Sequence, residues 1–351
     1  MTEATRFTVG MDLGDRFSRV CVLDSGGAVV EESRVQTTRD GLREAFARRP
    51  AALVVIEVGG HSPWVDRELR AMGHEVIVAN ARALPTIYAS DRKNDRNDAR
   101  RLAELARVDR KLLSPIQHRS EQAQVDLAVV RARDVLVRTR TQLMNSMRGV
   151  VKATGGRLGR CSSAAFVKKC EEQVPPALRA ALTPMLRALD AVGEQIREYD
   201  RRIVVLASER YPATQVVGQP SGVGPVTSLA YVLTLDDPRR FAKSRQVAAW
   251  LGLVPRQDQS GAQDRQLPIT KAGDRFLRRL LVTSANYILG PFGPDTALRR
   301  FGLKLCERGG SRAKKRATVA VARKLAALMH RLWVTGEIYE PLRGVPTAAT
   351  A

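Results

Sequence analysis

The sequence predicts an α/β domain, then a long helical segment, then a mainly helical C-terminal domain. Three observations predict this architecture. Apolar strand-like runs alternate with helical stretches up to residue 112, apolar residues at heptad spacing follow, and beyond Gly218 glycines and prolines separate further apolar helices. A chain of 351 residues has room for two or three domains of ordinary size. We expect boundaries at 1–112, 113–212 and 213–342, with a disordered tail at 343–351.

The first domain begins with three expected strands at residues 7–13, 19–24 and 28–37. Gly26 and Gly27 make a turn between the last two, and the short spacings make all three antiparallel neighbours. Apolar strands and helices then alternate, at residues 41–49, 53–58, 63–73 and 75–80, before a helix that starts near Asp95. An antiparallel meander followed by two β/α units is the order of an RNase H-like fold. In that fold the first and fourth strands are adjacent at the centre of the sheet.

The middle segment predicts two long helices. Residues 119–152 are polar and helical, and after Pro175-Pro176 a second helix has an apolar seam at alternating spacings of three and four. The seam consists of Met185, Leu189, Val192, Ile196, Tyr199, Ile203 and Leu206. An antiparallel hairpin within one chain and a coiled coil between chains both fit this pattern. We favour self-association, because the seam is longer than a local packing stripe requires.

The amino-acid composition indicates which class of molecule this protein binds. Lys and Arg number 58 against 36 Asp and Glu, a formal charge of +22, which predicts a polyanion partner and nucleic acid first. A merely soluble basic surface is the alternative. Aromatic residues at 5% argue against base stacking as the main binding device. The sequence lacks an apolar run long enough to span a membrane, a signal peptide and any C-x-x-C, so we expect a cytoplasmic protein with reduced thiols and no membrane partner.

Four acidic residues stand out by position. Asp12 lies in the first apolar strand and Glu57 ends the strand at 53–58, where a carboxylate without a partner or metal would cost several kcal/mol. Asp95 and Asp98 are three residues apart, so they share one face of a helix. A solvated helix start is the alternative for that pair. In an RNase H-like sheet the four carboxylates converge, and hard oxygen donors of this kind suit Mg²⁺.

The C-terminal region carries the candidate nucleic-acid contacts. QPSGVGPVTSLAYVL resembles a helix-hairpin-helix element, in which Gly222 and Gly224 let the backbone approach a phosphate. A basic cluster, Lys314, Lys315 and Arg316, starts an amphipathic helix. The remaining binding candidates are Arg256, Arg265, Lys271, Arg275 and Arg278, since cationic side chains pair well with phosphate oxygens. Solvated surface charge is an equally good account of these residues.

Taken in order, the motifs VGMDLG, VIEVGG, KNDRNDA, QPSGVGPVTSLAYVL, RFAKSRQVAAWLGLVPRQDQSG and ITKAGDRFLRRLLV resemble the insertion-sequence transposases related to the Piv DNA invertases. That family joins a RuvC-like DEDD domain to a C-terminal transposase domain carrying a serine. The resemblance implies that Asp12, Glu57, Asp95 and Asp98 are the catalytic tetrad and bind Mg²⁺, for which Mn²⁺ can substitute. It implies that Ser260 attacks DNA and holds the strand as a 5′-phosphoserine.

The same resemblance implies partners. Donor and target DNA would be recombined under the guidance of a bridge RNA, in a tetramer assembled from dimers whose active sites are composite, inside a bacterial-type cytoplasm in association with the nucleoid. Two departures concern the site. Glu57 is followed by Val-Gly-Gly-His where members often have a small residue, Ser-Gly and an aromatic, and the loop after Ser260 carries an extra acid, Asp264, where a more basic stretch is expected.

Two other functions stay open at this point. A serine needs a base or a metal to activate it, and His61, His74, His118 and His330 form no Ser–His–Asp pattern. Ser260 is therefore either activated through the acidic site or an ordinary loop serine. In the second case the chain is a junction-resolvase-like nuclease that depends on metal and forms no covalent intermediate. A non-catalytic DNA- or RNA-binding assembly protein is the third reading.

Overall fold

The computed structural model describes residues 7–80, 95–260, 263–307 and 309–344, without the side chains of residues 95–96 and 258–266. The chain divides into two compact units, residues 1–118 and 119–351, with the long helical segment in the second. The finer boundaries expected at residues 112, 212 and 342 stay predictions. The expected disordered tail lies, from residue 345 onward, outside the described residues.

The first unit is built on a mixed five-stranded sheet. Its strands are β1 (Thr8–Asp12), β2 (Phe17–Leu23), β3 (Val29–Gln36), β4 (Leu53–Glu57) and β5 (Glu75–Ala79), in the spatial order β3-β2-β1-β4-β5. The first three pair antiparallel, and β4 is parallel to both β1 and β5. The predicted meander and the predicted adjacency of the first and fourth strands are confirmed. The assignment to the RNase H-like folds stays a prediction.

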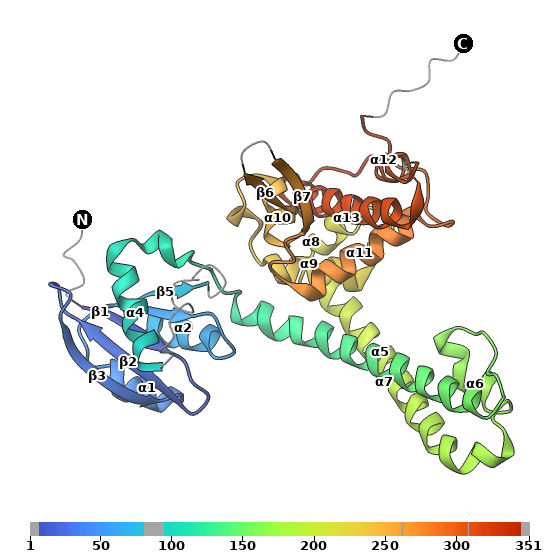
Figure 1. The fold of residues 1–351 in the computed structure, drawn as a ribbon, viewed down its shortest axis with the longest axis horizontal. Helices are drawn as coiled ribbons and strands as arrows, with labels where there is room; N and C mark the ends of the chain where they lie inside the picture. Colours follow the sequence, from blue (N-terminus) through green and yellow to red (C-terminus); the bar gives the residue numbers. More distant parts are fainter. Residues whose placement is uncertain (1–6, 81–94, 261–262, 308, 345–351) are drawn as a thin grey trace. The chain divides into compact units, whose positions relative to one another are not determined.

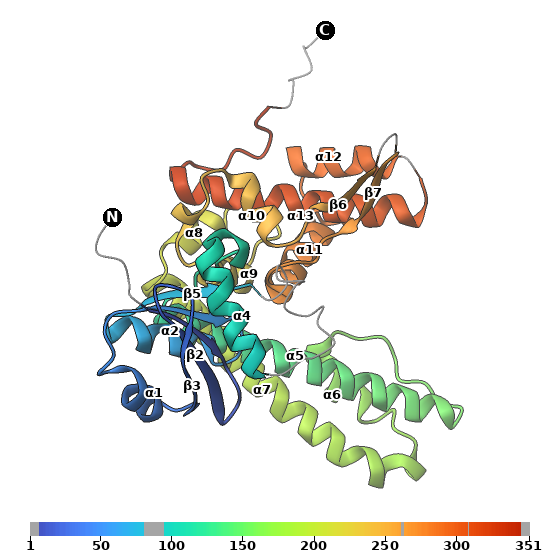
Figure 2. The same cartoon turned by 60° about the vertical axis from the view of Figure 1, so that its left-hand side comes forward.

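Helices cover both faces of this sheet (Figures 1 and 2). The helices α1 (Arg39–Phe46) and α2 (Ser62–Ala71) pack on one face, over a core that includes Met11, Ile56 and Leu69. The helix α4 (Asp95–Val108) packs on the other face, against β1 and β2 and over Val55. Because β4 is buried on both faces, its sequence up to Ile56 is a continuous apolar run rather than an alternating one.

The second unit begins with an antiparallel helical hairpin. Its arms are α5 (Glu121–Ala153) and α7 (Arg179–Glu209), joined through α6 (Phe166–Cys170). The seam residues Leu189, Ile196 and Ile203 are buried within the chain, and Arg133 on α5 bonds Asp200 on α7 at 2.7 Å. The structure therefore has the hairpin alternative. Each helix pairs with the other helix of the same chain, which accounts for the seam, and self-association stays a prediction.

The rest of the second unit is a helical bundle with one small sheet. Its helices are α8 (Ala213–Val217), α9 (Pro225–Leu235), α10 (Ser244–Trp250), α11 (Arg275–Leu289), α12 (Ala297–Cys306) and α13 (Gly310–Thr335). The apolar helix α9 is almost wholly buried at its centre, where the hydroxyl of Tyr231 donates to the carbonyl of Ala326 on α13 at 2.7 Å. Short 3₁₀ turns occupy Arg110–Leu113, Ser163–Ala165, Pro176–Leu178 and Pro238–Arg240.

The sequence missed one element. The stretch around QSG was predicted as a loop, whereas it forms an antiparallel hairpin of β6 (Pro255–Ser260) and β7 (Gln263–Ile269). Its polar residues carry no apolar alternation, so no strand signal was available. The coarse prediction of an α/β part followed by a mostly helical part is confirmed. Among the helices that the structure describes, none is both long enough and apolar enough to cross a lipid bilayer.

Candidate functional site

Asp12 and Glu57 end two neighbouring parallel strands at the same level. In the β1–β4 register Met11 pairs with Ile56, so the next residue on each strand is one of the two acids. Side chains two residues apart lie on one face of a sheet, so Asp12 shares the face of Gly10, and Glu57 that of Val55. Both acids are half-buried. The two carboxylates therefore belong to one edge and one face of the sheet, the face that α4 covers.

Gly10 sets how closely α4 approaches that face. A Cβ atom on Gly10 would lie 1.8 Å from the carbonyl oxygen of Ala99 and 2.8 Å from the nitrogen of Ala103. Only glycine permits such contact between the strand and the helix backbone. Gly10, within the motif VGMDLG, was not among the predicted site residues, although a glycine inside an apolar strand is a recognisable signal of close backbone approach.

The direction of α4 brings its acidic end to the same edge. Arg107, near the end of α4, donates to the carbonyls of Asp24 and Ser25 at 2.8 and 2.7 Å, just past the end of β2. That turn lies beside the start of β1, because Thr8 pairs with Leu23. The helix thus runs antiparallel to β1, and its first turns lie toward Asp12. Asp95 is the first residue of α4, and Asp98 lies one turn further on.

Asp98 is the most unusual of these acids. It is 8% exposed, and its Oδ1 atom is buried without a hydrogen-bond partner among the residues that the structure describes. A buried carboxylate oxygen that accepts nothing costs about 1–3 kcal/mol, so its presence calls for a ligand. Oxygen donors of this type suit a hard divalent cation. Within the described part of the chain no three Asp, Glu, His or Cys side chains meet closely enough to hold a metal ion. The side chain of Asp95, the fourth predicted ligand, lies outside that part.

His61 forms part of the rim beyond Glu57. Its Nδ1 accepts a hydrogen bond from the indole of Trp64 at 3.1 Å, so the ring hydrogen is on Nε2, which faces the Asp15 carboxylate at 3.6 Å. Asp15 follows Asp12 by three residues. The departure from the resembled motif at His61 therefore changes the rim and leaves the strand that carries Glu57 intact.

Ser260 is the last residue of β6 and pairs with Gln263 on β7. Its side chain and those of Arg265 and Asp264 lie outside the described residues. The base of this hairpin is closely built: Gly252 and Gly273 both have positive φ, and a Cβ on Gly252 would lie 2.3 Å from the nitrogen of Ala272. The structure thus presents Ser260 at the end of a short arm that is anchored at its base.

Arg278 supplies that anchor. Its Nη1 donates to the carbonyls of Leu251 at 2.9 Å and Ala272 at 2.6 Å, which lie before β6 and after β7. A guanidinium nitrogen committed to two carbonyls is structural. Arg278 was predicted to contact nucleic acid, and its Nη1 could do so only by giving up these two hydrogen bonds. Lys271, another predicted contact, is exposed and adopts a left-handed backbone with φ 55°.

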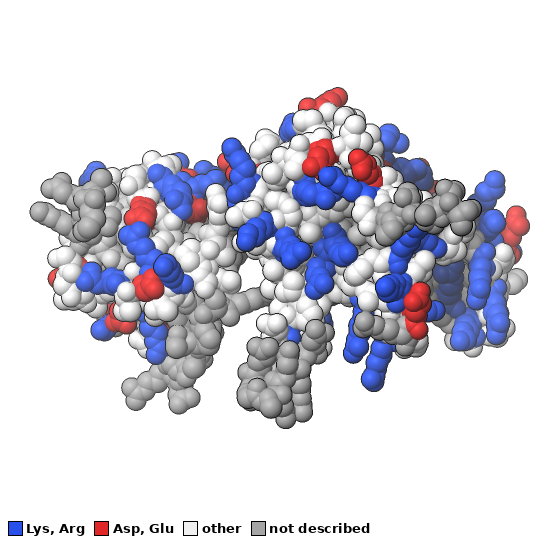
Figure 3. Space-filling model, turned by 90° about the horizontal axis from the view of Figure 1, so that it is seen from above, with Lys and Arg blue, Asp and Glu red and all other residues white. Residues whose placement is uncertain are grey.

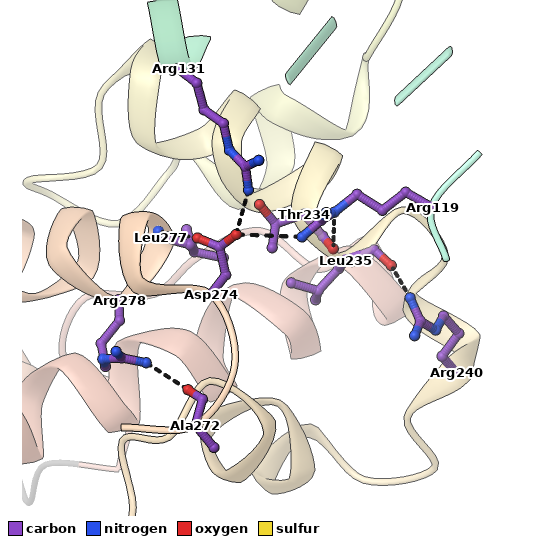
Figure 4. A network of polar contacts seen from close by, with 9 residues as sticks. All are labelled: Arg119, Arg131, Thr234, Leu235, Arg240, Ala272, Asp274, Leu277 and Arg278. Carbon is purple, nitrogen blue, oxygen red and sulfur yellow. Dashed lines mark hydrogen bonds and ion pairs between the residues drawn. The ribbon is translucent and has the colours of Figure 1, made fainter. Parts of the chain in front are cut away.

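The start of α11 is tied to the rest of the unit through Asp274. Its carboxylate caps the helix by accepting from the nitrogen of Leu277 at 2.8 Å, and it also receives Arg131 at 2.7 Å and Arg119 at 3.5 Å (Figure 4). Arg119 further donates to the carbonyl of Thr234 at 3.1 Å. Burial lowers the pKa of Arg119, and the opposing charge of Asp274 offsets part of that effect. No local pattern predicts this network, because its members are far apart in the chain.

The predicted helix-hairpin-helix glycines lie between α8 and α9. Gly222 has φ 86°, and a Cβ there would meet Tyr287 at 2.9 Å and the carbonyl of Ser284 at 3.0 Å. Gly224 precedes α9 as its N-cap, and a Cβ there would meet nothing within 4 Å. An open groove of about 430 Å³ adjoins both, lined by Gly222, Val223, Gly224, Thr227, Leu280, Thr283, Ser284 and Tyr287. Gly222 is therefore required for packing on α11, whereas Gly224 leaves the amino end of α9 open.

The other predicted contacts are exposed. Arg256 lies on β6, Arg275 is the first residue of α11, and Lys314, Lys315 and Arg316 lie in the first turns of α13. Ala313 and Ala317 on either side of that cluster are buried, so the three cations project from the outer face of the helix. Asp12 and Glu57 thus share one edge of the sheet in the first unit, with Asp98 on the helix that covers their face, and the predicted serine and basic residues belong to the second unit.

Sequence comparisons match both regions. A DEDD transposase model of the IS110 type matches residues 9–155, and the transposase model of the IS116/IS110/IS902 family matches residues 215–296. A family 20 transposase of Pseudomonas aeruginosa is 32% identical over 346 residues, covering 95% of this chain and 98% of the relative. The chain belongs to the IS110/IS116 transposase family.

Two further relatives of this IS110/IS116 chain are informative. The transposase of insertion element IS1111A from Coxiella burnetii is 31% identical over 344 residues, covering 94% of this chain and 90% of the relative. A pilin gene-inverting protein of Moraxella lacunata is 28% identical over 110 residues, covering 31% of this chain and 33% of the relative. Membership of a transposase family implies the cutting and rejoining of DNA.

Proposed function

We propose that this transposase is an RNA-guided DNA recombinase that moves its own mobile element through a 5′-phosphoserine intermediate on Ser260. The acidic edge formed by Asp12, Glu57, Asp95 and Asp98 would serve as its divalent-metal site. The likeness to a gene-inverting protein supports strand exchange without net loss of DNA. The first unit would be RNase H-like, of the RuvC-like kind.

The single observation that carries this proposal is the unpartnered Oδ1 of Asp98. It lies buried on the helix that covers the face of Asp12 and Glu57, with its acidic end at their edge of the sheet. Natural proteins leave few buried carboxylate oxygens without a partner, and functional sites are where such exceptions occur. Carboxylate oxygens are the donors that Mg²⁺ prefers, and Mn²⁺ accepts the same set.

When bound, Mg²⁺ supplies charge neutralisation and polarisation of the phosphodiester. The chain's own residues perform the remaining tasks. Gly10 keeps α4 against β1, which holds Asp98 at the edge, and the β6–β7 hairpin presents Ser260 on a base fixed by Arg278. Because the acids and the serine belong to different units, a composite site shared between subunits of a dimer or tetramer is compatible with this division of labour.

The proposed chemistry balances without an external energy source. Ser260 Oγ forms a bond to phosphorus as the bond from phosphorus to the 3′ oxygen breaks, and the proton lost by serine leaves with the released 3′-hydroxyl. In the reverse sense a 3′-hydroxyl of a partner strand attacks the phosphoserine and regenerates the free serine. One phosphodiester is consumed and one is formed, so no nucleotide triphosphate is needed, and the sequence contains no P-loop motif.

The test is denaturing capture of covalent protein–DNA adducts from cells that express the gene with its native flanking DNA. Wild type, Ser260→Ala and Asp12→Asn are compared, with the exposed residues Ser146 and Glu44 changed to Ala and Gln as matched controls. The proposal expects an adduct in wild type and both controls and in neither site variant. RNA that copurifies with the chain and maps to the element's own end is the corresponding expectation for guidance.

A metal-dependent nuclease without a covalent intermediate is the second candidate, favoured by the same Asp98 observation. It expects Ser260→Ala to cut DNA almost as well as wild type, and Asp12→Asn to be inactive. If the chain were a non-catalytic nucleic-acid-binding protein, neither Ser260→Ala nor Asp12→Asn would affect transposition.

A further inference from the structure

The far end of the α5–α7 hairpin is a small module with its own core. The last turns of α5, the helix α6 and the first turns of α7 bury a cluster that is separate from the main core of the second unit. The cluster comprises Met144, Met147, Val151, Phe166, Cys170, Val174, Leu182, Leu186 and Leu189. Such a core makes this end of the hairpin, which we call the hairpin tip (residues 148–187), an ordered surface.

The hairpin tip is strongly basic. It contains two acidic residues, Glu171 and Glu172, and eight basic ones: Arg148, Lys152, Arg157, Arg160, Lys168, Lys169, Arg179 and Arg187. All of the basic residues except Arg148 are exposed, and Arg148 is half-buried with its guanidinium 5.0 Å from the ring centre of Phe166. Figure 3 shows Lys and Arg side chains gathered at the end of the second unit where α6 lies in Figure 1.

The cations of the hairpin tip differ in their ion pairing from several of the arginines on the rest of the hairpin. Nearer the main core four arginines are paired within the chain: Arg133 with Asp200, Arg138 with Asp134, Arg201 with Glu198 and Arg210 with Asp126. Three others there, Arg140, Arg197 and Arg202, make no ion pair with the described residues. In the part of the chain that the structure describes, no cation of the hairpin tip makes an ion pair. Like charges held together repel one another, so a fold retains them at some cost unless a polyanion relieves the repulsion.

We propose that the hairpin tip is a nucleic-acid-binding module that contacts the phosphodiester backbone. The proposal rests on the proposed function only in taking nucleic acid as the polyanion. The one aromatic residue of the module, Phe166, is fully buried, so bases have no exposed ring on which to stack. Exposed Lys and Arg without an exposed aromatic neighbour predict binding to the phosphodiester backbone that depends on salt.

The experiment measures how binding by the full chain depends on salt. Fluorescence anisotropy with a labelled DNA duplex and with a labelled single-stranded RNA is recorded over a series of KCl concentrations, for wild type and for Lys152→Ala/Lys168→Ala/Lys169→Ala. If each lysine neutralises one phosphate, the slope of log K against log salt falls in magnitude by about 2.7 on duplex or about 2.1 on single strands. The probe that shows the change identifies whether DNA or RNA is the ligand.

The charge-matched control is Arg100→Ala/Arg110→Ala/Arg201→Ala. These three arginines are exposed like the lysines, but each is paired with a carboxylate of its own chain. The control removes the same charge and is expected to change the slope by less than about one. A Lys→Arg version of the triple variant keeps the charge and is expected to retain the wild-type slope.

All measurements are made in EDTA, so failure of the serine chemistry leaves their outcome unchanged, and thermal unfolding shows that each variant is folded. A folded triple alanine variant with the wild-type slope on both probes overturns the proposal. A control variant that loses as much slope as the tip variant overturns it too, because net charge alone would then explain the binding.

Discussion

Replacing Gly10 by alanine tests the contact that holds α4, and with it Asp98, against the strand of Asp12. The added Cβ would lie 1.8 Å from the carbonyl oxygen of Ala99, and ordinary contact begins at 3.4 Å, so the helix must retreat by about 1.6 Å. Because the obstructing atoms are backbone, no rotamer change relieves the clash. Overpacking of this kind costs about 3 kcal/mol, the upper part of its usual range. That would lower the unfolding temperature of the first unit by roughly 12 °C or more.

Gly60→Ala is the matched control. Gly60 follows Glu57 by three residues, and a Cβ atom on Gly60 would meet nothing within 4 Å. Differential scanning calorimetry should show Gly60→Ala within about 0.5 kcal/mol of wild type. If the clash at Gly10 did not exist, Gly10→Ala would instead raise the free energy of unfolding by about 0.5–1 kcal/mol, because glycine inside a strand is destabilising relative to alanine. Since misplacement by an ångström costs about 100-fold in catalysis, DNA cutting by Gly10→Ala should fall at least that far. A Gly10→Ala protein as stable as wild type would refute this account of α4.

Three further predictions concern single side chains. Asp98→Ala removes the unpartnered Oδ1, so it should stabilise the metal-free protein by about 1 kcal/mol in thermal unfolding while abolishing cutting; a loss of stability would contradict the role given to Asp98. Burial would raise the pKa of Asp126, but hydrogen bonds from Tyr211, Arg210 and Gln122 outweigh it and lower that pKa. The contribution of Asp126 is therefore present above its ordinary pKa of 3.8 and is lost as pH falls below it, so the deficit of about 2 kcal/mol expected for Asp126→Asn in urea unfolding at neutral pH should shrink in acid. Burial raises the pKa of the Cys170 thiol from 9.0 to about 11, so iodoacetamide at pH 9 should label Cys161 well before Cys170 by mass spectrometry, and the thiol's contribution to stability should be lost as pH rises from 9 to about 11.

The sheet was predictable because its signals are local. The runs at 53–58 and 75–80 are apolar on both faces, as expected for strands of a sheet that helices cover on both sides. These runs predicted the order of the strands, and that order placed Asp12 and Glu57 at a common edge of the sheet. The closeness of α4 did not follow, because the distance between a strand and a helix depends on the absent side chain of Gly10, which periodicity does not measure.

Two features could not be predicted from the sequence: the partner of the apolar seam and the β6–β7 hairpin. An apolar seam looks the same whether its partner helix belongs to the same chain or to another, so Leu189 and Ile196 predicted helix pairing without predicting the partner. The β6–β7 hairpin is held by backbone hydrogen bonds and by Arg278 at its base, and neither leaves a pattern in side-chain hydrophobicity. The position of Ser260 on a strand could therefore not be read in advance.

The central claim is that Ser260 carries the DNA strand, and the most direct test is to find the nucleotide on that residue. Trypsin cleaves after Arg256 and Arg265 and releases residues 257–265, QDQSGAQDR, in which Ser260 is the only hydroxyl side chain. Captured adducts are digested with nuclease and trypsin and then examined by mass spectrometry. The account predicts that this peptide carries the mass of a 5′-linked nucleotide in wild type. Recombination that proceeds while the peptide stays unmodified, or a nucleotide on another peptide, would contradict it.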